Sequence, residues 1–428
     1  GTCLHVGCIP SKALLHAAKL ITDARDGEHI GVSFGAPKID IDIVRGHWQK
    51  VVDTLSKNLV GLSKARKVNL VHGVGRFVDD HTIEVEGGSR YRFEHCVVAT
   101  GSIPAKPQMF NLPTPRVMDS TGALKLEDLP ARLLVVGGGY IGLEMAEAFV
   151  DRGAAVTLVD RASQPLRTID PDLAGNVTQV LSGYGVKVHL GVAVQGFGDH
   201  VVETSDGTYP ADLVVLGMGV EPASGLARDA GLDLGARDAI KVNPRQQTSA
   251  AGIYAAGDCA DTFHLVSRER VHIALGTVAN KTARVAGVNL AGGYASFSGV
   301  LGTALTRICE YEIGRTGLSQ AQADAAGIEY AVGTADATSR AGYFPGARPV
   351  TARVLAERGS GRLIGGQIVG ADRVGKRIDT LAAAITGGLT ALDLVDLDLG
   401  YSPAVSPLWD PLQLAAQDAV AALGRLGR

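Results

Sequence analysis

The pattern of apolar and polar positions changes several times along the chain, and each change predicts a different kind of element. An Ala- and Leu-rich stretch predicts a helix over 9–22, and residues 47–67 predict a second helix. Short alternating runs between Gly-Gly and Asp-Asp turns then predict a β-meander over 68–98, with one of its strands at 91–98. The run 97–102 predicts a buried strand that ends in a tight turn.

The second part of the chain alternates between buried strands and helices. An apolar strand from Arg132, a glycine cluster, a helix to about Arg152 and a strand at 155–160 form a βαβ pattern. Further buried strands are predicted at 211–216 and 253–258, a hairpin over 353–369, and helices after Lys376 and over 411–423.

Composition narrows the class of protein. The 428 residues suggest roughly three domains. No apolar run approaches the ~18 residues of a membrane helix, so we expect no membrane segment. A net charge of -3 without a basic block gives no footprint for nucleic acid. Five cysteines are too few for a secreted disulfide scaffold, which favours a cytoplasmic protein.

The glycine cluster has the spacing of a dinucleotide-binding turn. Gly137, Gly139 and Gly142 fit G-x-G-x-x-G between a strand and a helix, where the first glycine permits a tight turn and the second lets a pyrophosphate approach the backbone. Asp160 ends the next strand and can accept the ribose hydroxyls of NADH. Arg161 and Arg167 complicate this preference because they can pair with the 2′-phosphate of NADPH.

Two cysteines stand five positions apart at the start of the chain. Cys3 and Cys8 can approach each other where the chain enters a helix, and the helix N-terminus and Lys12 favour a thiolate at Cys8. On spacing alone, a redox pair and two incidental buried cysteines both remain open. A zinc site is less supported because no second Cys/His pair has a matching spacing, and we expect no metal.

The segment from Gly1 to Lys12, Gly-Thr-Cys-Leu-His-Val-Gly-Cys-Ile-Pro-Ser-Lys, resembles the redox-disulfide segment of the flavin-dependent pyridine nucleotide-disulfide oxidoreductases. Dihydrolipoamide dehydrogenase, glutathione reductase and mercuric reductase typify this family. The resemblance continues through Ala99-Thr-Gly101, Gly142-Leu-Glu144 and Ala255-Ala-Gly-Asp258, so it covers essentially the whole chain.

The resemblance implies an electron path from NAD(P)H to FAD, to a Cys3–Cys8 disulfide and then to a substrate disulfide. Cys8 is then the thiol next to the flavin, Cys3 the thiol that attacks the substrate, and Lys12 the partner of Glu144. The cofactor-binding residues that follow from the motif and the resemblance are Thr2, Lys12, Thr100, Gly101, Gly137, Gly139, Gly142, Glu144, Asp160, Gly219, Gly257, Asp258, Leu275, Gly276 and Thr277.

The implied fold is α/β, with two Rossmann-like nucleotide-binding domains and a C-terminal α+β dimerisation domain. We expect a split FAD domain at 1–116 and 242–297, an inserted NAD(P) domain at 117–241 and the dimerisation domain at 298–428. The family's first glycine motif, upstream of the cysteines, is absent from this sequence, so we expect that an N-terminal βαβ segment of the FAD domain is missing.

The C-terminal part departs from the lipoamide and glutathione enzymes. No histidine follows His272 to supply their His-Pro…Glu base. The segments around Tyr343 and Tyr401 instead resemble coenzyme A-disulfide reductases and NADH oxidases, in which two tyrosines of the partner subunit stand in place of that histidine. This implies a homodimer that reduces a small disulfide, persulfide or polysulfide, with the tyrosines as proton donors.

Three alternatives remain at this point. The two-cysteine segment also fits dihydrolipoamide dehydrogenase. A metal reductase similar to mercuric reductase is less supported because the C-terminal tail has no cysteine. A non-catalytic scaffold with a flavin-binding fold is the third alternative.

Overall fold

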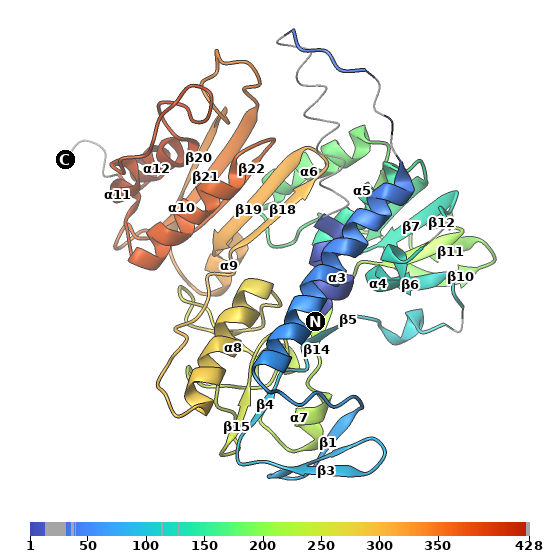
Figure 1. Cartoon of the computed structure of the whole chain (residues 1–428). Coiled ribbons are helices and arrows are strands. Elements are labelled where there is room, and N and C mark those ends of the chain that lie inside the picture. Colours follow the sequence, from blue (N-terminus) through green and yellow to red (C-terminus); the bar gives the residue numbers. More distant parts are fainter. Residues whose placement is uncertain (13–30, 36–37, 39, 113, 127, 425–428) are drawn as a thin grey trace. The chain divides into compact units, whose positions relative to one another are not determined.

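The computed structural model describes residues 1–12, 31–35, 38, 40–112, 114–126 and 128–424, which fall into two compact units (Figure 1). The first unit contains the N-terminal residues with 42–105 and 220–300, and the second contains 106–219 and the residues from 301 onward. The helix expected over 9–22 lies outside the described residues beyond Lys12, and residues 8–12 are helical.

The first unit contains the long helix α3 (Ile41–Ala65). It begins before residue 47, where the sequence pattern predicts its start. The β-branched residues Ile41, Ile43 and Val44 obscure this first turn, because alternation with aspartates is typical of a strand. Asp42 nevertheless lies in the first turn, where a negative charge favours a helix N-terminus.

The meander is smaller than the sequence pattern suggests. Strands β1 (Gly75–Asp79), β2 (Thr82–Val85) and β3 (Ser89–Arg92) form an antiparallel sheet. The strand expected over 91–98 is wrong as one element, because the chain leaves this sheet after Arg92. It continues as β4 (Cys96–Val98), which pairs in parallel with β15 (Ile253–Ala255).

The remaining elements of the first unit are short apart from one helix. Strand β5 (Ser102–Pro104) pairs with β14 (Val220–Pro222). The others are α1 (Thr2–Val6), α7 (Gly225–Asp229), η3 (Ala236–Asp238), β16 (Thr262–Phe263), β17 (Arg270–Val271) and the 15-residue helix α8 (Gly276–Leu290).

A five-stranded parallel sheet forms the first half of the second unit, in the order β6-β13-β7-β8-β9. Its strands are β6 (Val117–Asp119), β7 (Arg132–Val136), β8 (Ala155–Asp160), β9 (Lys187–Leu190) and β13 (Leu213–Leu216). The nearby elements are η2 (Gln108–Phe110), α4 (Ser120–Leu124), α5 (Tyr140–Val150), α6 (Pro171–Gly183), β10 (Val194–Gly198), β11 (Val201–Thr204) and β12 (Gly207–Pro210). This is a Rossmann-like arrangement, as the sequence predicts.

A five-stranded antiparallel sheet forms the second half of this unit, in the order β18-β19-β22-β21-β20. Its strands are β18 (Ala304–Ile308), β19 (Tyr311–Gly317), β20 (Tyr330–Thr338), β21 (Pro349–Glu357) and β22 (Leu363–Gly370). Helix α10 (Val374–Gly387) packs on β19 and β22, and α12 (Pro411–Ala422) packs on β20 and β21 (Figure 1). The short helices are α9 (Gln320–Ala325) and α11 (Ala391–Val395).

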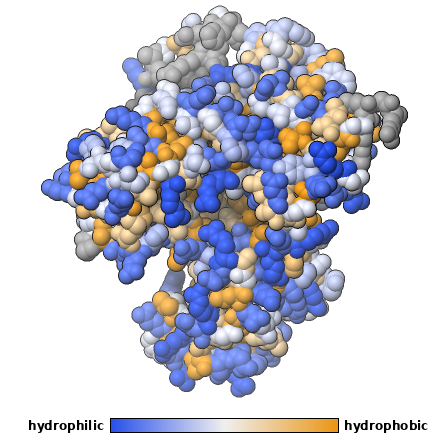
Figure 2. Space-filling model, turned by 180° about the vertical axis from the view of Figure 1, so that it is seen from behind, coloured by the Kyte–Doolittle hydropathy of each residue, from blue (hydrophilic) through white to orange (hydrophobic). Residues whose placement is uncertain are grey.

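The buried core of the second unit is made of aliphatic side chains. Leu133, Leu134 and Leu158 on the parallel sheet are at most 1% exposed. Hydrophobic and hydrophilic residues are interspersed on the face of the molecule seen in Figure 2. Within the described residues, every helix is too short or too polar to span a membrane. The α/β class with a Rossmann-like sheet and a C-terminal α+β part is confirmed.

Candidate functional site

The glycine turn between β7 and α5 is closed so tightly that two of its glycines tolerate no side chain. A Cβ atom at Gly142 would lie 1.8 Å from the carbonyl oxygen of Gly137. Gly137 has a φ of +108°, and a Cβ there would lie 2.7 Å from the oxygen of Gly217. At Gly139 the nearest atom would be 3.9 Å away, so this side of the turn is open.

The open side of this turn coincides with the start of α5. Gly139 caps the helix without a side-chain hydrogen bond, which leaves the first backbone N–H groups of α5 available to an anion. Tight packing on one side and free donors on the other fit a dinucleotide pyrophosphate. These glycines are therefore suited to hold NAD(P)H, as the spacing predicts.

Asp160 ends β8 next to this turn. Its Oδ2 accepts a hydrogen bond of 2.5 Å from the Gly138 N–H, and its Oδ1 accepts one of 2.8 Å from the Ala162 N–H. The carboxylate therefore fastens the glycine turn to the end of β8, in addition to the ribose contact expected for it. Arg161 and Arg167, which follow it in the sequence, are exposed.

Glu144 lies in the second turn of α5 and is buried, with 6% of its surface exposed. Its Oε1 accepts a hydrogen bond of 2.8 Å from the hydroxyl of Thr306 on β18. A carboxylate held in this way is not a solvated helix residue. Thr306 was missed by the sequence reasoning, because no motif connects it with Glu144.

The two cysteines are free thiols on neighbouring helical turns of the first unit. Burial and the hydrogen bond with Cys3 raise the pKa of Cys8 to about 12, whereas the charge of Lys12 lowers it. Lys12 therefore lowers the pKa of Cys8, as expected, but its effect is smaller than the combined effect of burial and Cys3 when both thiols are reduced. The Ser11 hydroxyl donates to the Cys8 carbonyl oxygen at 3.2 Å.

The N-terminus of α8 lies close to the cysteines. A Cβ at Gly276 would be 3.9 Å from the Cys3 sulfur. Leu275 caps α8 without a side-chain hydrogen bond, so the first N–H groups of a 15-residue helix are available beside the thiol. Thr277 lies in the same first turn, and Thr2 begins α1, which also carries Cys3.

The carboxyl ends of β4 and β15 carry the other residues expected to hold the flavin. After β4, Thr100 donates a hydrogen bond of 2.6 Å to the Ala223 carbonyl, and Gly101 has a φ of +75° with no atom within 4 Å of its Cβ position. After β15, Asp258 accepts a hydrogen bond of 2.9 Å from Ser102. Since nucleotides bind at the carboxyl ends of parallel strands, this edge and α8 fit FAD.

Two further glycines of the predicted set adopt backbone conformations that favour glycine. Gly257, directly before Asp258, has a φ of +83°, and Gly219, after β13, has a φ of +87°. Both stand at turns that follow buried strands, which agrees with the sequence pattern. Their contacts with a cofactor remain predictions.

The two tyrosines meet in the second unit, although 58 positions separate them. The phenol oxygens of Tyr343 and Tyr401 lie 3.3 Å apart. The side chains are exposed by 78% and 48%, respectively. Their hydrogen bond raises the pKa of Tyr401 above that of an ordinary tyrosine. Tyr401 is therefore protonated at neutral pH, and the exposed pair offers a hydrogen-bond donor.

The expected residues are thus divided between the two units. The cysteines, Lys12, Asp258 and the start of α8 belong to the first unit, and the glycine turn, Glu144 and the tyrosines belong to the second. The described residues contain no group of three or more His, Cys, Asp or Glu side chains that could hold a metal ion.

Comparison with known proteins covers nearly the whole chain. Residues 1–283 match the model for the pyridine nucleotide-disulphide oxidoreductase family, and residues 303–411 match its dimerisation domain. An NAD(P)H sulfur oxidoreductase (CoA-dependent) from Pyrococcus furiosus is 35% identical over 81% of this chain and 83% of its own length. A dihydrolipoyl dehydrogenase from Haloferax volcanii is 33% identical over 92% of this chain and 84% of its own length.

A solved structure is also similar to this chain. The NAD-dependent persulfide reductase from A. fulgidus is 34% identical, with a TM-score of 0.81 over 85% of this chain and 71% of its own.

Proposed function

The chain belongs to the pyridine nucleotide-disulphide oxidoreductase family, and on this premise we propose that it reduces a low-molecular-weight disulfide, persulfide or polysulfide with NAD(P)H through Cys3 and Cys8. Its relatives are NAD(P)H-dependent enzymes that act on sulfur groups, which counts against a non-catalytic scaffold. When bound, NAD(P)H and FAD supply the two electrons that reduce the Cys3–Cys8 disulfide.

We propose that the two cysteines reduce the substrate in two successive thiol–disulfide exchanges. The Cys3 thiolate attacks one sulfur of the substrate, forms a mixed disulfide and expels the other sulfur as a thiolate. The Cys8 thiolate then attacks Cys3, which releases the second substrate sulfur and restores the Cys3–Cys8 disulfide. Each cycle therefore consumes two electrons and two protons.

The observation that carries this proposal is the hydrogen-bonded pair of Tyr343 and Tyr401. A phenol can donate a hydrogen bond or a proton to a leaving thiolate, but with an ordinary pKa of about 10 it is a poor base at neutral pH. The raised pKa of Tyr401 keeps this phenol protonated, so it is available as a hydrogen-bond donor and not as a base. The pair therefore favours the reduction of a disulfide over the oxidation of a dithiol.

We propose that the tyrosines act on the cysteines of the partner subunit in a homodimer. The match of residues 303–411 to a dimerisation domain supports this arrangement. Exposed apolar side chains on the loop between α11 and α12, which carries Tyr401, also support a dimer. Leu408 is 71% exposed and Trp409 is 49% exposed.

Dihydrolipoamide dehydrogenase is the second candidate function. The two-cysteine segment and the relative from Haloferax volcanii favour it. It requires a base for dithiol oxidation, and the tyrosine pair is a weak one.

The test is anaerobic NADH oxidation by the flavin-loaded protein with coenzyme A disulfide, polysulfide or lipoamide. We expect the first two to be preferred. Cys3→Ser should abolish turnover and keep the bleaching of the flavin by NADH, and Tyr401→Phe should lower turnover about tenfold. A clear preference for lipoamide, or full turnover in Cys3→Ser, would contradict the proposal.

A further inference from the structure

The two tyrosines stand on loops and not on a helix or strand. Tyr343 belongs to the loop between β20 and β21, and Tyr401 to the loop between α11 and α12. One backbone hydrogen bond joins the loops directly, from the Ala341 N–H to the Pro403 carbonyl oxygen at 3.2 Å. A phenol–phenol distance of 3.3 Å therefore needs further support, because a hydrogen bond is lost when its atoms separate by a few tenths of an ångström more.

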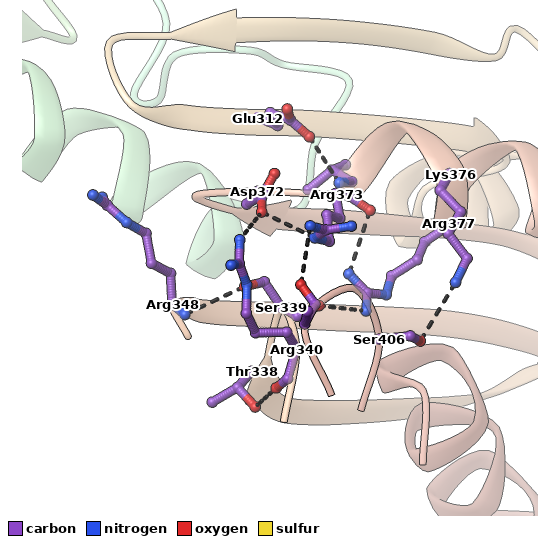
Figure 3. Close-up of polar contacts among 12 residues, drawn as sticks. Glu312, Thr338, Ser339, Arg340, Arg348, Asp372, Arg373, Lys376, Arg377 and Ser406 are labelled. Atoms are coloured by element: carbon purple, nitrogen blue, oxygen red, sulfur yellow. Dashed lines mark hydrogen bonds and ion pairs between the residues drawn. The ribbon is translucent and has the colours of Figure 1, made fainter. Parts of the chain in front are cut away.

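Arg377 on α10 supplies the first support. Its side chain is 1% exposed. One end of the guanidinium donates to the Ser339 carbonyl oxygen at 3.0 Å, where the Tyr343 loop begins. Its Nε donates to both oxygens of Asp410, at 3.1 and 3.0 Å, where the Tyr401 loop ends. A single buried arginine thus holds the bases of both loops. Figure 3 shows its contact with Ser339.

Asp372, in the turn between β22 and α10, supplies the second support. Its Oδ2 accepts a hydrogen bond of 2.9 Å from Arg340 in the Tyr343 loop. The same oxygen accepts one of 3.1 Å from Arg373, which also donates to the Ala404 carbonyl oxygen of the Tyr401 loop at 3.3 Å. Figure 3 shows these side chains converging on Asp372.

The charges in this cluster argue against an anion-binding site. Arg340 and Arg373 pair with Asp372, and Arg377 pairs with Asp410. The arginines are therefore used to join chain segments. The contacts of these residues connect the two tyrosine loops to helix α10 or to the turn that precedes it.

We propose that Arg377 and Asp372 are positioning residues that hold Tyr343 and Tyr401 at hydrogen-bond distance for protonation of the leaving thiolate. The role in protonation rests on the proposed function, whereas the support of the two loops by Arg377 and Asp372 does not. Without the two supports, each loop gains conformational freedom, and the phenols spend less time in contact. Tyr401 then titrates as a separate tyrosine.

The first measurement follows the phenol pair without any turnover. 3-Fluorotyrosine placed at position 401 of the flavin-loaded protein reports its own titration by fluorine NMR. Tyr343→Phe should lower the midpoint by about half a pH unit or more, because it removes the hydrogen bond. Asp372→Asn and Arg377→Lys should also lower the titration midpoint of position 401. In a protein that already carries Tyr343→Phe, neither change should lower this midpoint further.

The variants differ in risk, and a matched control separates positioning from stability. Arg377→Lys disturbs a buried ion pair, whereas Asp372 is 35% exposed and its replacement by Asn keeps the side-chain shape. Arg353→Lys is the control, because Arg353 is a buried arginine on β21 whose carboxylate partners are Asp170 and Asp172. It should leave the titration of position 401 unchanged.

The second measurement is a double-mutant cycle on disulfide turnover. Asp372→Asn should lower kcat about as much as Tyr343→Phe, with no additional loss in the double variant, and flavin reduction by NADH should stay unchanged. An unchanged titration at position 401 in both Asp372→Asn and Arg377→Lys would overturn the positioning role. If the titration shifts but Tyr343→Phe keeps full turnover, the positioning role stands and the proposed function loses its proton donor.

Discussion

Thr306 on β18 donates a buried hydrogen bond of 2.8 Å to Glu144 on α5, across 162 positions of sequence. The helix that begins at the glycine turn is thereby joined to the antiparallel sheet within the second unit. The contact helps to orient the Glu144 carboxylate.

Replacing Thr306 by Val tests the contact. The change keeps the shape of the side chain but removes the hydroxyl that donates to the buried Glu144 carboxylate, so we expect a loss of about 1–3 kcal/mol in the free energy of unfolding. Urea denaturation measures it. Thr306→Ser is the matched control, since it retains the hydroxyl. Equal losses in Ser and Val would assign the effect to packing.

Two glycines of one turn should respond differently to alanine. At Gly142 the added Cβ would lie 1.8 Å from a backbone oxygen, so Gly142→Ala should lower the melting temperature strongly. At Gly139 the nearest atom is 3.9 Å away, so Gly139→Ala should keep the melting temperature and weaken NADH binding, because the methyl group occupies the open side. Thermal melts and NADH titrations measure the two effects. Normal NADH affinity in Gly139→Ala would show that the pyrophosphate lies elsewhere.

Glu147 should make the protein less stable as the pH rises from 4.5 to about 7. Burial raises the pKa of this 3% exposed carboxyl to about 7 from 4.5, and one of its oxygens has no hydrogen-bond partner. The protonated form is favoured by the fold, so its contribution is complete below pH 4.5 and is lost as the pH rises to 7. The loss amounts to about 3 kcal/mol.

Urea denaturation of Glu147→Gln at pH 5 and pH 8 tests this dependence. The variant stays uncharged, so its stability relative to the unaltered protein should increase between the two pH values. If the variant and the unaltered protein differ in stability by the same amount at pH 5 and pH 8, Glu147 is not the cause of the pH dependence.

The nucleotide preference should depend on the arginines that follow β8. Arg161 and Arg167 are exposed and follow Asp160 in the sequence, and an arginine near this acidic residue can accommodate a 2′-phosphate. We expect Arg161→Gln to raise the KM for NADPH about tenfold, the loss of one exposed charge contact, and to leave the KM for NADH unchanged. Arg152→Gln, at the far end of α5, is the control. A parallel rise for both nucleotides would argue against 2′-phosphate recognition.

The sequence predicts the nucleotide-binding half well, because its elements depend on local patterns. The glycine spacing and the apolar strands of 132–160 form β7, α5 and β8 with bounds close to those expected. The start of α3 and the break between β3 and β4 were not predicted. In both cases a tertiary arrangement decides between helix and strand where the local pattern is ambiguous.

The tyrosine pair and its supports show a different limit. Tyr343 and Tyr401 were identified through family resemblance, and the contact between them depends on two loops far apart in sequence. Arg377 was missed. A usable signal existed, because Arg377 stands on the same helix face as Val374, Ile378 and Leu381, where a charged residue indicates a buried ion pair.

Both phenols belong to one chain, and this has a genetic consequence if they serve the partner's cysteines. A mixed dimer of a Cys3→Ser subunit and a Tyr343→Phe subunit then contains one intact site and one doubly defective site, so the two defects complement each other to half activity. A mixed dimer of Tyr343→Phe and Tyr401→Phe contains no intact pair. The tyrosine mutations thus form one complementation group, and the cysteine mutations form another.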